Sequence, residues 1–223
     1  VSWQATKTGF SKYINGNGGS IRKTVSNYVK SSGGAGELLK SSSSGIRATA
    51  NISRLFAGIQ RDGYEKTFEN LGIEYQGKGA KEICSDLVNY VSAPSNSKED
   101  AVAREAAINA MSKIYQFIES NGLDIKALDK IDNNLMDEVV GAYVECYIWG
   151  RILNDLEYCL EKNSDDIERT LQIEDEMKSY VSNVVDVAFH SSGIREKIFG
   201  YKTISAGVEE LYKKCYSALE DMK

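Results

Sequence analysis

The sequence contains a single histidine, His190, and this limits the chemistry that its side chains can perform. Zinc sites with two or more histidine ligands are excluded, and so are di-iron bundles built on paired Glu-x-x-His motifs. Asp186 and Ser191 lie near His190 in the sequence and imitate part of a catalytic triad, but no nucleophile-elbow motif accompanies them. We expect His190 to be a loop or partly buried residue, and we predict no catalytic residues and no enzyme activity.

Carboxylates and thiols are the remaining groups that could do chemistry. Acidic runs occur at residues 165–166 and 174–176. Adjacent carboxylates on a helix point in different directions, so these runs indicate a solvated helix surface. The four cysteines form no CxxC pair and stand apart in the sequence: Cys84, Cys146, Cys159 and Cys215. We expect buried, reduced thiols, with a disulfide as the open alternative, and we predict no metal site and no cofactor.

The segment NGNGGSIRK, residues 15–23, has the glycines of a phosphate-binding loop. It lacks the GK[ST] ending and a preceding strand, so it is not a P-loop. The start of a helix at Ser20 and Ile21 would attract an anion weakly. A flexible glycine linker is the interpretation that the composition favours.

The first 45 residues differ in composition from the rest of the chain. They contain eight glycines and ten serines, which resist regular structure because ordering them costs much backbone entropy. Residues 1–50 carry seven basic side chains and one acidic one, whereas the whole chain has a net charge of −5. We therefore predict a flexible basic arm at residues 1–45 with transient or docked helical pieces, one of them at 21–30 and capped by Ser20. A helical, acidic domain is predicted at 46–223.

The arm carries aromatic, cationic and glycine residues that suit a contact with another macromolecule. Large aromatic side chains can anchor a flexible segment on a partner protein. We predict a partner-binding role for eight residues: Trp3, Lys7, Phe10, Tyr13, Gly18, Gly19, Arg22 and Lys23.

Two other functions compete with partner binding. The basic arm with its aromatic residues suits a nucleic-acid-binding module, although the basic residues are spread out and the acidic body would repel phosphates. An enzyme that uses His190 or the acidic runs is the third reading. We rank partner binding first, nucleic acid second and catalysis third.

The body reads as an all-α multi-helix bundle. One proline, Pro94, permits long helices, and Ser97 to Asp100 is a capping signal for a helix that reaches about Glu119. Residues 134–162 are apolar on most sides, which is typical of a central helix surrounded by others. We expect its exposed strip to run through Glu145, Arg151, Asp155 and Glu161. A further helix is expected from about Asp165 to Val187, with residues 184–189 as the one segment where a strand competes.

No stretch of the sequence is long and apolar enough for a membrane span, and the first residues contain no apolar signal segment. We expect a soluble intracellular protein that does not bind membranes. The first residue is not methionine, so we expect a processed form or a fragment.

The order of several short motifs carries a resemblance to a known family. These motifs are Trp3-Gln4-Ala5-x-Lys7, Gly16-Asn17-Gly18-Gly19-Ser20, Tyr28-Val29-Lys30, Gly33-Gly34-Ala35, Ser44-Gly45, Leu55-Phe56-Ala57-Gly58, Leu71-Gly72 and Val144-Glu145-Cys146-Tyr147-Ile148. Their order over nearly the whole chain is similar to the QatB family of the four-gene Qat antiphage defence system.

The resemblance implies a bacterial, cytoplasmic and non-catalytic component of a defence complex. The family's operon also encodes an ATPase, a QueC-like enzyme of the deazaguanine type and a TatD-like nuclease. The QueC-like protein is the partner that the resemblance implies, with the ATPase and the nuclease as further candidates. Because an unfolded segment can conform to a cleft, we expect the arm to be presented to the QueC-like protein, with modification of the arm as one outcome.

Overall fold

The computed structural model describes residues 1–163 and 166–221. Over these residues it contains eleven α-helices, one 3-10 helix and no strand, which confirms the all-α prediction. The elements are α1 (Trp3–Ile14), α2 (Ile21–Ser31), α3 (Ala35–Lys40), α4 (Ser43–Asp62), α5 (Tyr64–Leu71), α6 (Ala80–Val91), α7 (Lys98–Ser120), η1 (Ile125–Lys130), α8 (Asn133–Asn163), α9 (Ile167–Phe189), α10 (Ile194–Ile198) and α11 (Ile204–Glu220). In this part of the chain, no helix combines the length and the apolar character that crossing a membrane requires.

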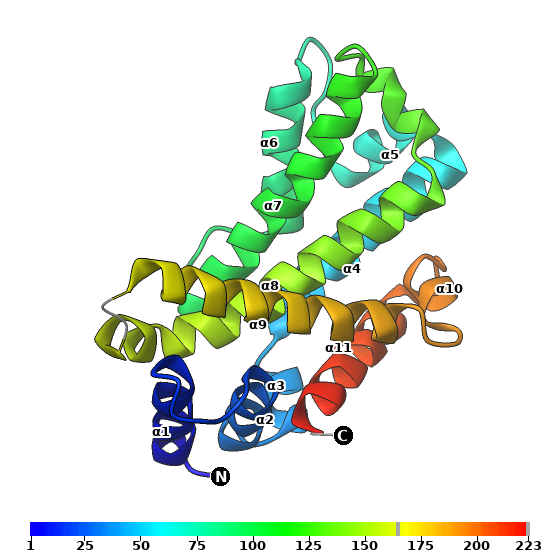
Figure 1. The fold of residues 1–223 in the computed structure, drawn as a ribbon. Helices are drawn as coiled ribbons and strands as arrows, with labels where there is room; N and C mark the ends of the chain where they lie inside the picture. Colours follow the sequence, from blue (N-terminus) through cyan, green and yellow to red (C-terminus); the bar gives the residue numbers. More distant parts are fainter. Residues whose placement is uncertain (164–165, 222–223) are drawn as a thin grey trace.

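The central position of α8 is confirmed. Helices α1, α4, α7 and α9 all contact it, and Figure 1 shows α9 crossing in front of α8 while α4 passes behind. Twelve of its residues are buried: Met136, Val139, Val140, Tyr143, Val144, Cys146, Tyr147, Ile148, Ile152, Leu156, Cys159 and Leu160. Burial on so many sides follows from the apolar composition of the helix, because each apolar stripe needs a covering element.

The expected exposed strip of α8 is only half correct. Asp155 and Glu161 are exposed, but Glu145 and Arg151 are half-buried under neighbouring helices. Burial raises the pKa of the Glu145 carboxyl, with a further contribution from the charge of Asp186. The strip therefore narrows where other helices cross it, a feature that helical periodicity alone does not reveal.

The residues predicted to begin or end helices do so in the structure. Ser20 and Ser97 cap α2 and α7, each accepting a hydrogen bond from the backbone N–H three residues on, at 3.2 Å for Lys23 and 3.0 Å for Asp100. Gly72 ends α5 in the left-handed conformation at φ 70°. The segment 184–189 is helical within α9, so the strand alternative is wrong there. The expected first residue of that helix, Asp165, lies outside the described residues.

Residues 1–45 are more ordered than predicted, because the structure shows three docked helices where a flexible arm with transient or docked helical pieces was expected. Figure 1 shows α1, α2 and α3 lying against α8, α9 and α11. Val25, Tyr28 and Val29 are buried on one face of α2. Periodic apolar residues and a serine cap outweigh the entropy cost of the glycines, which the chain confines to the turns. The predicted domain boundary at residue 45 falls inside α4, because this helix begins at Ser43.

Gly45 permits a close crossing of α4 and α8 in the core. A Cβ atom at this position would lie 2.5 Å from two ring carbons of Tyr147, whose side chain is fully buried. Such a distance is too short for any side chain, so α4 and α8 can approach this closely only with glycine here. Tyr147 fills the space that the missing side chain leaves.

The substitution Gly45→Ala should destabilise the fold by about 1–3 kcal/mol, because the added methyl overpacks the core. Gly141→Ala is the matched control, since Gly141 is a helical residue of α8 with open space around its Cβ position. Alanine there should stabilise by up to about 1 kcal/mol through helix propensity. Urea unfolding of the three proteins measures both effects. Equal stability of the two variants would contradict the tight crossing.

Candidate partner interface at the N-terminal hairpin

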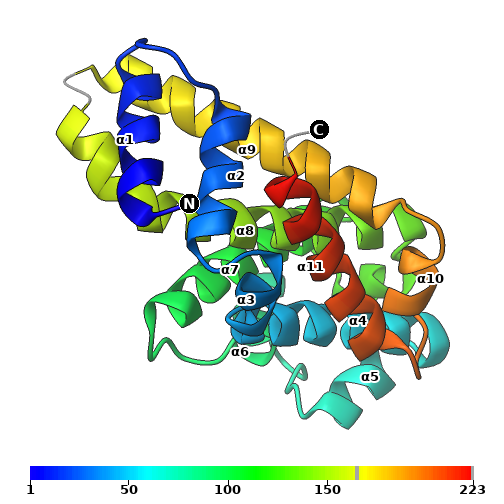
Figure 2. The same cartoon turned by 90° about the horizontal axis from the view of Figure 1, so that it is seen from below.

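Helices α1 and α2 form a hairpin, residues 3–31, at one edge of the molecule. Figure 2 shows the two helices side by side, with α8 and α9 near α1 and with α11 on the far side of α2. The Thr6 hydroxyl ties the pair together by donating to the Asn27 carbonyl at 3.1 Å. Five basic residues and no acidic residue lie in residues 1–32. The hairpin is thus a cationic, folded projection on an acidic body.

The structure separates the eight predicted partner-binding residues into two groups. Lys7, Gly18, Gly19, Arg22 and Lys23 are exposed. Trp3 is 37% exposed, with its ring edge-on to Tyr28 at a centroid distance of 5.7 Å.

The other two predicted residues face inward. Phe10 is fully buried, so it fastens α1 to the body and is unavailable to a partner while the hairpin is docked. Tyr13 is half-buried; its hydroxyl donates to the Glu176 carboxylate, and its ring lies 5.4 Å from the Arg169 guanidinium carbon. These contacts are intramolecular anchors of the hairpin rather than a free surface.

The loop between α1 and α2 opens into a cavity of about 420 Å³. Gly18, Gly19, Ser20, Lys12 and Lys23 are among the residues that line it. Both glycines have φ near +100°, at 96° and 99°, a conformation that other residues avoid. The structure therefore brings three predicted residues together, Gly18, Gly19 and Lys23, and adds Lys12, whereas Trp3 lies elsewhere.

Specific hydrogen bonds hold the hairpin to the body. The Tyr28 hydroxyl donates to Asp155 of α8 at 2.8 Å, and the Ser26 hydroxyl donates to the carbonyl of Glu220 at 2.6 Å. Burial is the main cause that raises the pKa of Tyr28, followed by the charge of Asp155. The phenol thus stays protonated at neutral pH and can keep donating. The hairpin is thus hydrogen-bonded to α8 through Tyr28 and to the end of α11 through Ser26, and Tyr13 adds the bond to α9.

A buried polar network lies beneath this region, where α4, α7 and α8 meet. The Glu99 carboxylate accepts from the Tyr147 hydroxyl at 2.6 Å and from the backbone N–H groups of Ser44 and Gly45 at 3.0 and 3.2 Å. A carboxylate at the start of α4 satisfies donors that the helix itself leaves unpaired and complements its dipole. Glu99 therefore serves both as a helix cap and as the acceptor for a buried phenol.

Arg151 forms the second half of this network. Its guanidinium donates to the Ser42 hydroxyl at 2.9 Å and to the Ser41 carbonyl at 3.3 Å. Ser42 also shares a hydrogen bond of 2.6 Å with the Tyr216 hydroxyl. Sequence analysis placed Arg151 on an exposed strip, and its distant partners explain the error. Ser41, Ser42 and Ser44 belong to a serine run that composition assigns to the flexible arm, and this run is the sequence signal for the network.

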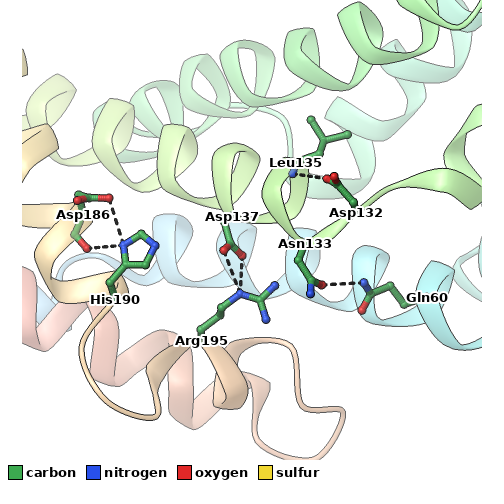
Figure 3. Close-up of polar contacts among 8 residues, drawn as sticks. All are labelled: Gln60, Asp132, Asn133, Leu135, Asp137, Asp186, His190 and Arg195. Atoms are coloured by element: carbon green, nitrogen blue, oxygen red, sulfur yellow. Dashed lines mark hydrogen bonds and ion pairs between the residues drawn. The ribbon is translucent and has the colours of Figure 1, made fainter.

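His190 and its neighbours do not assemble a catalytic triad. Figure 3 shows His190 beside Asp186, whose carbonyl lies 3.0 Å from the imidazole Nδ1. The Ser191 hydroxyl instead donates to the Ala188 carbonyl at 2.6 Å, and no hydrogen bond among the described residues joins it to His190. His190 is exposed, as a helix cap of α9. The part of the chain that the structure describes also contains no group of three potential metal ligands.

A row of polar contacts in Figure 3 ties the first turns of α8 to its neighbours. Asp132 caps α8 by accepting from the Leu135 N–H at 2.9 Å, and Gln60 of α4 donates to Asn133 at 3.2 Å. Asp137 accepts from the Arg195 Nε at 2.8 Å, which links α8 to α10. These pairs point to neighbouring helices rather than to a shared centre, so they position the bundle.

The four cysteines are free and buried, which confirms the expected thiols. Burial raises the pKa of Cys84 and of Cys146 to about 11, and the pKa of Cys215 to about 12. Burial also raises the pKa of Cys159. Only the thiolate reacts with disulfide reagents, so a raised pKa lowers reactivity at any pH below it.

A thiol-specific disulfide reagent at mildly alkaline pH should therefore label none of the cysteines in the folded protein within minutes. After denaturation all four should react, because burial is lost and the thiol pKa returns to its usual value of about 8.5. Absorbance of the released chromophore measures both states. Rapid labelling of the native protein would contradict the burial of these side chains.

Removal of the shared carboxylate with Glu99→Ala should lower the free energy of unfolding by about 1–3 kcal/mol, because the Tyr147 hydroxyl and two backbone donors lose their acceptor. Glu105→Ala, at an exposed position of the same helix, is the control and should change stability by less than about 0.5 kcal/mol. Chemical denaturation measures the difference. Similar values for the two variants would argue against the network.

The sequence was compared with family models, with curated proteins and with solved structures. A family model described as Qat anti-phage system associated protein QatB matches residues 33–219, from the turn after α2 into the last turns of α11. No curated protein matches the chain. No solved structure matches it either. The family match covers more than half of the sequence and leaves out α1 and α2. The chain therefore belongs to the QatB family, whose members are associated with the Qat anti-phage system.

Proposed function

We propose that this chain is a non-catalytic, cytoplasmic partner-binding component of a bacterial Qat anti-phage complex, and that it presents the N-terminal hairpin to the QueC-like protein. The family assignment supports a place in the defence system. The choice of partner comes from the resemblance of the sequence motifs. The ATPase and the TatD-like nuclease of the same operon are further candidates for contact.

The observation that carries this proposal is the cationic outer face of the hairpin. Lys7, Lys12 and Lys23 are exposed, and none of them forms an ion pair with any described residue. Trp3 adds a large, partly exposed aromatic ring, a residue type enriched at binding hot spots. The hairpin thus offers lysines that attract an acidic surface at long range and, at a separate position, an apolar anchor.

Folding of the hairpin changes how presentation would work. A partner would meet a docked helical hairpin and its glycine loop instead of an extended arm. The loop residues Gly16 to Ser20 are all exposed, so they are the part that a cleft can reach without undocking. A covalent modification of this segment by the QueC-like protein is the finer form of the proposal.

Nucleic acid is the second candidate, because the same exposed lysines would contact phosphates. Such binding would weaken steeply with salt. Absence of binding to single- and double-stranded oligonucleotides at low ionic strength would dispose of it.

The substitutions Lys7→Glu and Lys23→Glu, made together, should weaken co-purification with the QueC-like protein at least about tenfold, since like charges now face an acidic surface. Lys126→Glu with Lys130→Glu is the matched control, because both lysines are exposed on η1 away from the hairpin. Pull-down from co-expressing cells, with Kd values from interferometry, measures the effect. Point variants replace deletion of residues 1–45, which would remove buried core side chains.

Mass spectrometry of the chain co-expressed with the QueC-like protein tests modification. Unchanged binding in the hairpin variants, together with an unmodified residue 1–45 segment, would reject the proposed presentation. Equal loss of binding in the control pair would place the interface elsewhere on the surface.

A further inference from the structure

A second cavity lies away from the hairpin, between α4, α5 and the turn that joins α10 to α11. It measures about 630 Å³, within the range of about 300–1,000 Å³ that is usual for small-molecule sites. We call it the cationic cavity. Arg54 and Arg61 of α4, Asp62, Asn70 of α5, and Tyr201 and Lys202 of the turn are among its lining residues.

The helices bring these side chains together by a close approach. A Cβ atom on Gly58 would lie 2.7 Å from the Thr67 methyl, so α4 and α5 meet tightly at the base of the cavity. Arg54, Gly58 and Arg61 are four and three residues apart, which places them along one face of α4. The cavity therefore has a rigid helical wall that carries two guanidinium groups.

The charge of the cavity contrasts with that of its surroundings. Three cations line it against one carboxylate, Asp62. Residues 51–223 as a whole carry a net charge of −11, because residues 1–50 account for +6 of the total of −5. Lys202 is exposed and has no acidic partner within ion-pair distance among the described residues. A local excess of positive charge on an acidic body selects for an anionic ligand.

Tyr201 adds an aromatic surface to this charge. The Arg61 guanidinium carbon lies 4.6 Å from the centroid of the Tyr201 ring, and Asp62 holds the same guanidinium at 2.9 and 2.8 Å. Tyr201 nevertheless remains 72% exposed. The Arg61 cation over one face fixes the orientation of the Tyr201 ring. The exposed part of the ring can still stack on a flat ligand.

We propose that the cationic cavity binds a phosphorylated small molecule of the nucleotide class, with Arg54 and Lys202 contacting the phosphates and Tyr201 stacking on the base. Guanidinium groups match phosphate oxygens in a bidentate geometry, and the lysine adds a mobile point charge. Asn70 supplies an amide for a polar edge of the ligand. This site is separate from the hairpin and does not depend on a partner protein.

Isothermal titration of the full chain with ATP and with inorganic pyrophosphate tests the site. The change Arg54→Ala with Lys202→Ala should weaken binding of both probes about tenfold or more. Tyr201→Ala should weaken ATP binding about fivefold or more and leave pyrophosphate binding unchanged, because only ATP has a ring to stack. Lys126→Ala with Lys130→Ala, two exposed lysines of η1, is the control and should bind as the unaltered protein does.

Three results would overturn the proposal. The first is no heat of binding for ATP with the unaltered protein at low ionic strength. The second is binding that the Arg54 and Lys202 changes leave intact in a variant whose circular dichroism and melting temperature are normal. The third is tighter binding of a short single-stranded oligonucleotide than of ATP, which would make the cavity part of a nucleic-acid surface. A rise in melting temperature with ATP, lost in the cavity variant, would support the site independently.

Discussion

The carboxylate of Glu99 is the contact on which the arrangement of the long helices depends. It lies at the start of α7, accepts a hydrogen bond from the hydroxyl of the fully buried Tyr147 of α8, and caps the first turn of α4. Three helices thus share one acceptor at the point where they cross. The donors that surround this half-buried carboxylate compensate for the water that it loses. The close passage of α4 over Tyr147 at Gly45 brings the backbone donors within reach of that carboxylate.

Buried side chains and hydrogen bonds to the body together explain why a glycine- and serine-rich segment is ordered. The hairpin brings only positive side chains, while α9 and α8 offer Glu176 and Asp155 as hydrogen-bond acceptors for its tyrosines. These polar contacts add to the burial of Phe10, Val25 and Val29 in fixing the position of the hairpin. Lys7, Lys12 and Lys23 form no ion pair with any described residue, so these three lysines are available for binding.

The parts of the fold that depend on local sequence signals were predicted correctly. The boundaries of α8 differ from the predicted 134–162 by one residue at each end, and Ser20, Ser97 and Gly72 act as predicted, because capping and apolar periodicity depend on neighbours within a few residues. The extent of order in residues 1–45 was underestimated, because the composition favours a flexible segment while the deciding contacts come from α8, α9 and α11. Arg151 and the cationic cavity were missed for the same reason: Tyr201 and Arg54 are far apart in sequence.

The hairpin has a further property that follows from its hydrogen bond to the last helix. Ser26 and the carbonyl of Glu220 are 194 residues apart, and the Glu220 side chain also accepts from the N–H of Ala35 at the start of α3. On the ribosome, α2 and α3 emerge well before α11 and cannot complete their docking until α11 has left the exit tunnel. Nascent chains thus expose the buried faces of α2 and α3 until α11 has been made, and a co-translated partner or a chaperone can reach them during that interval.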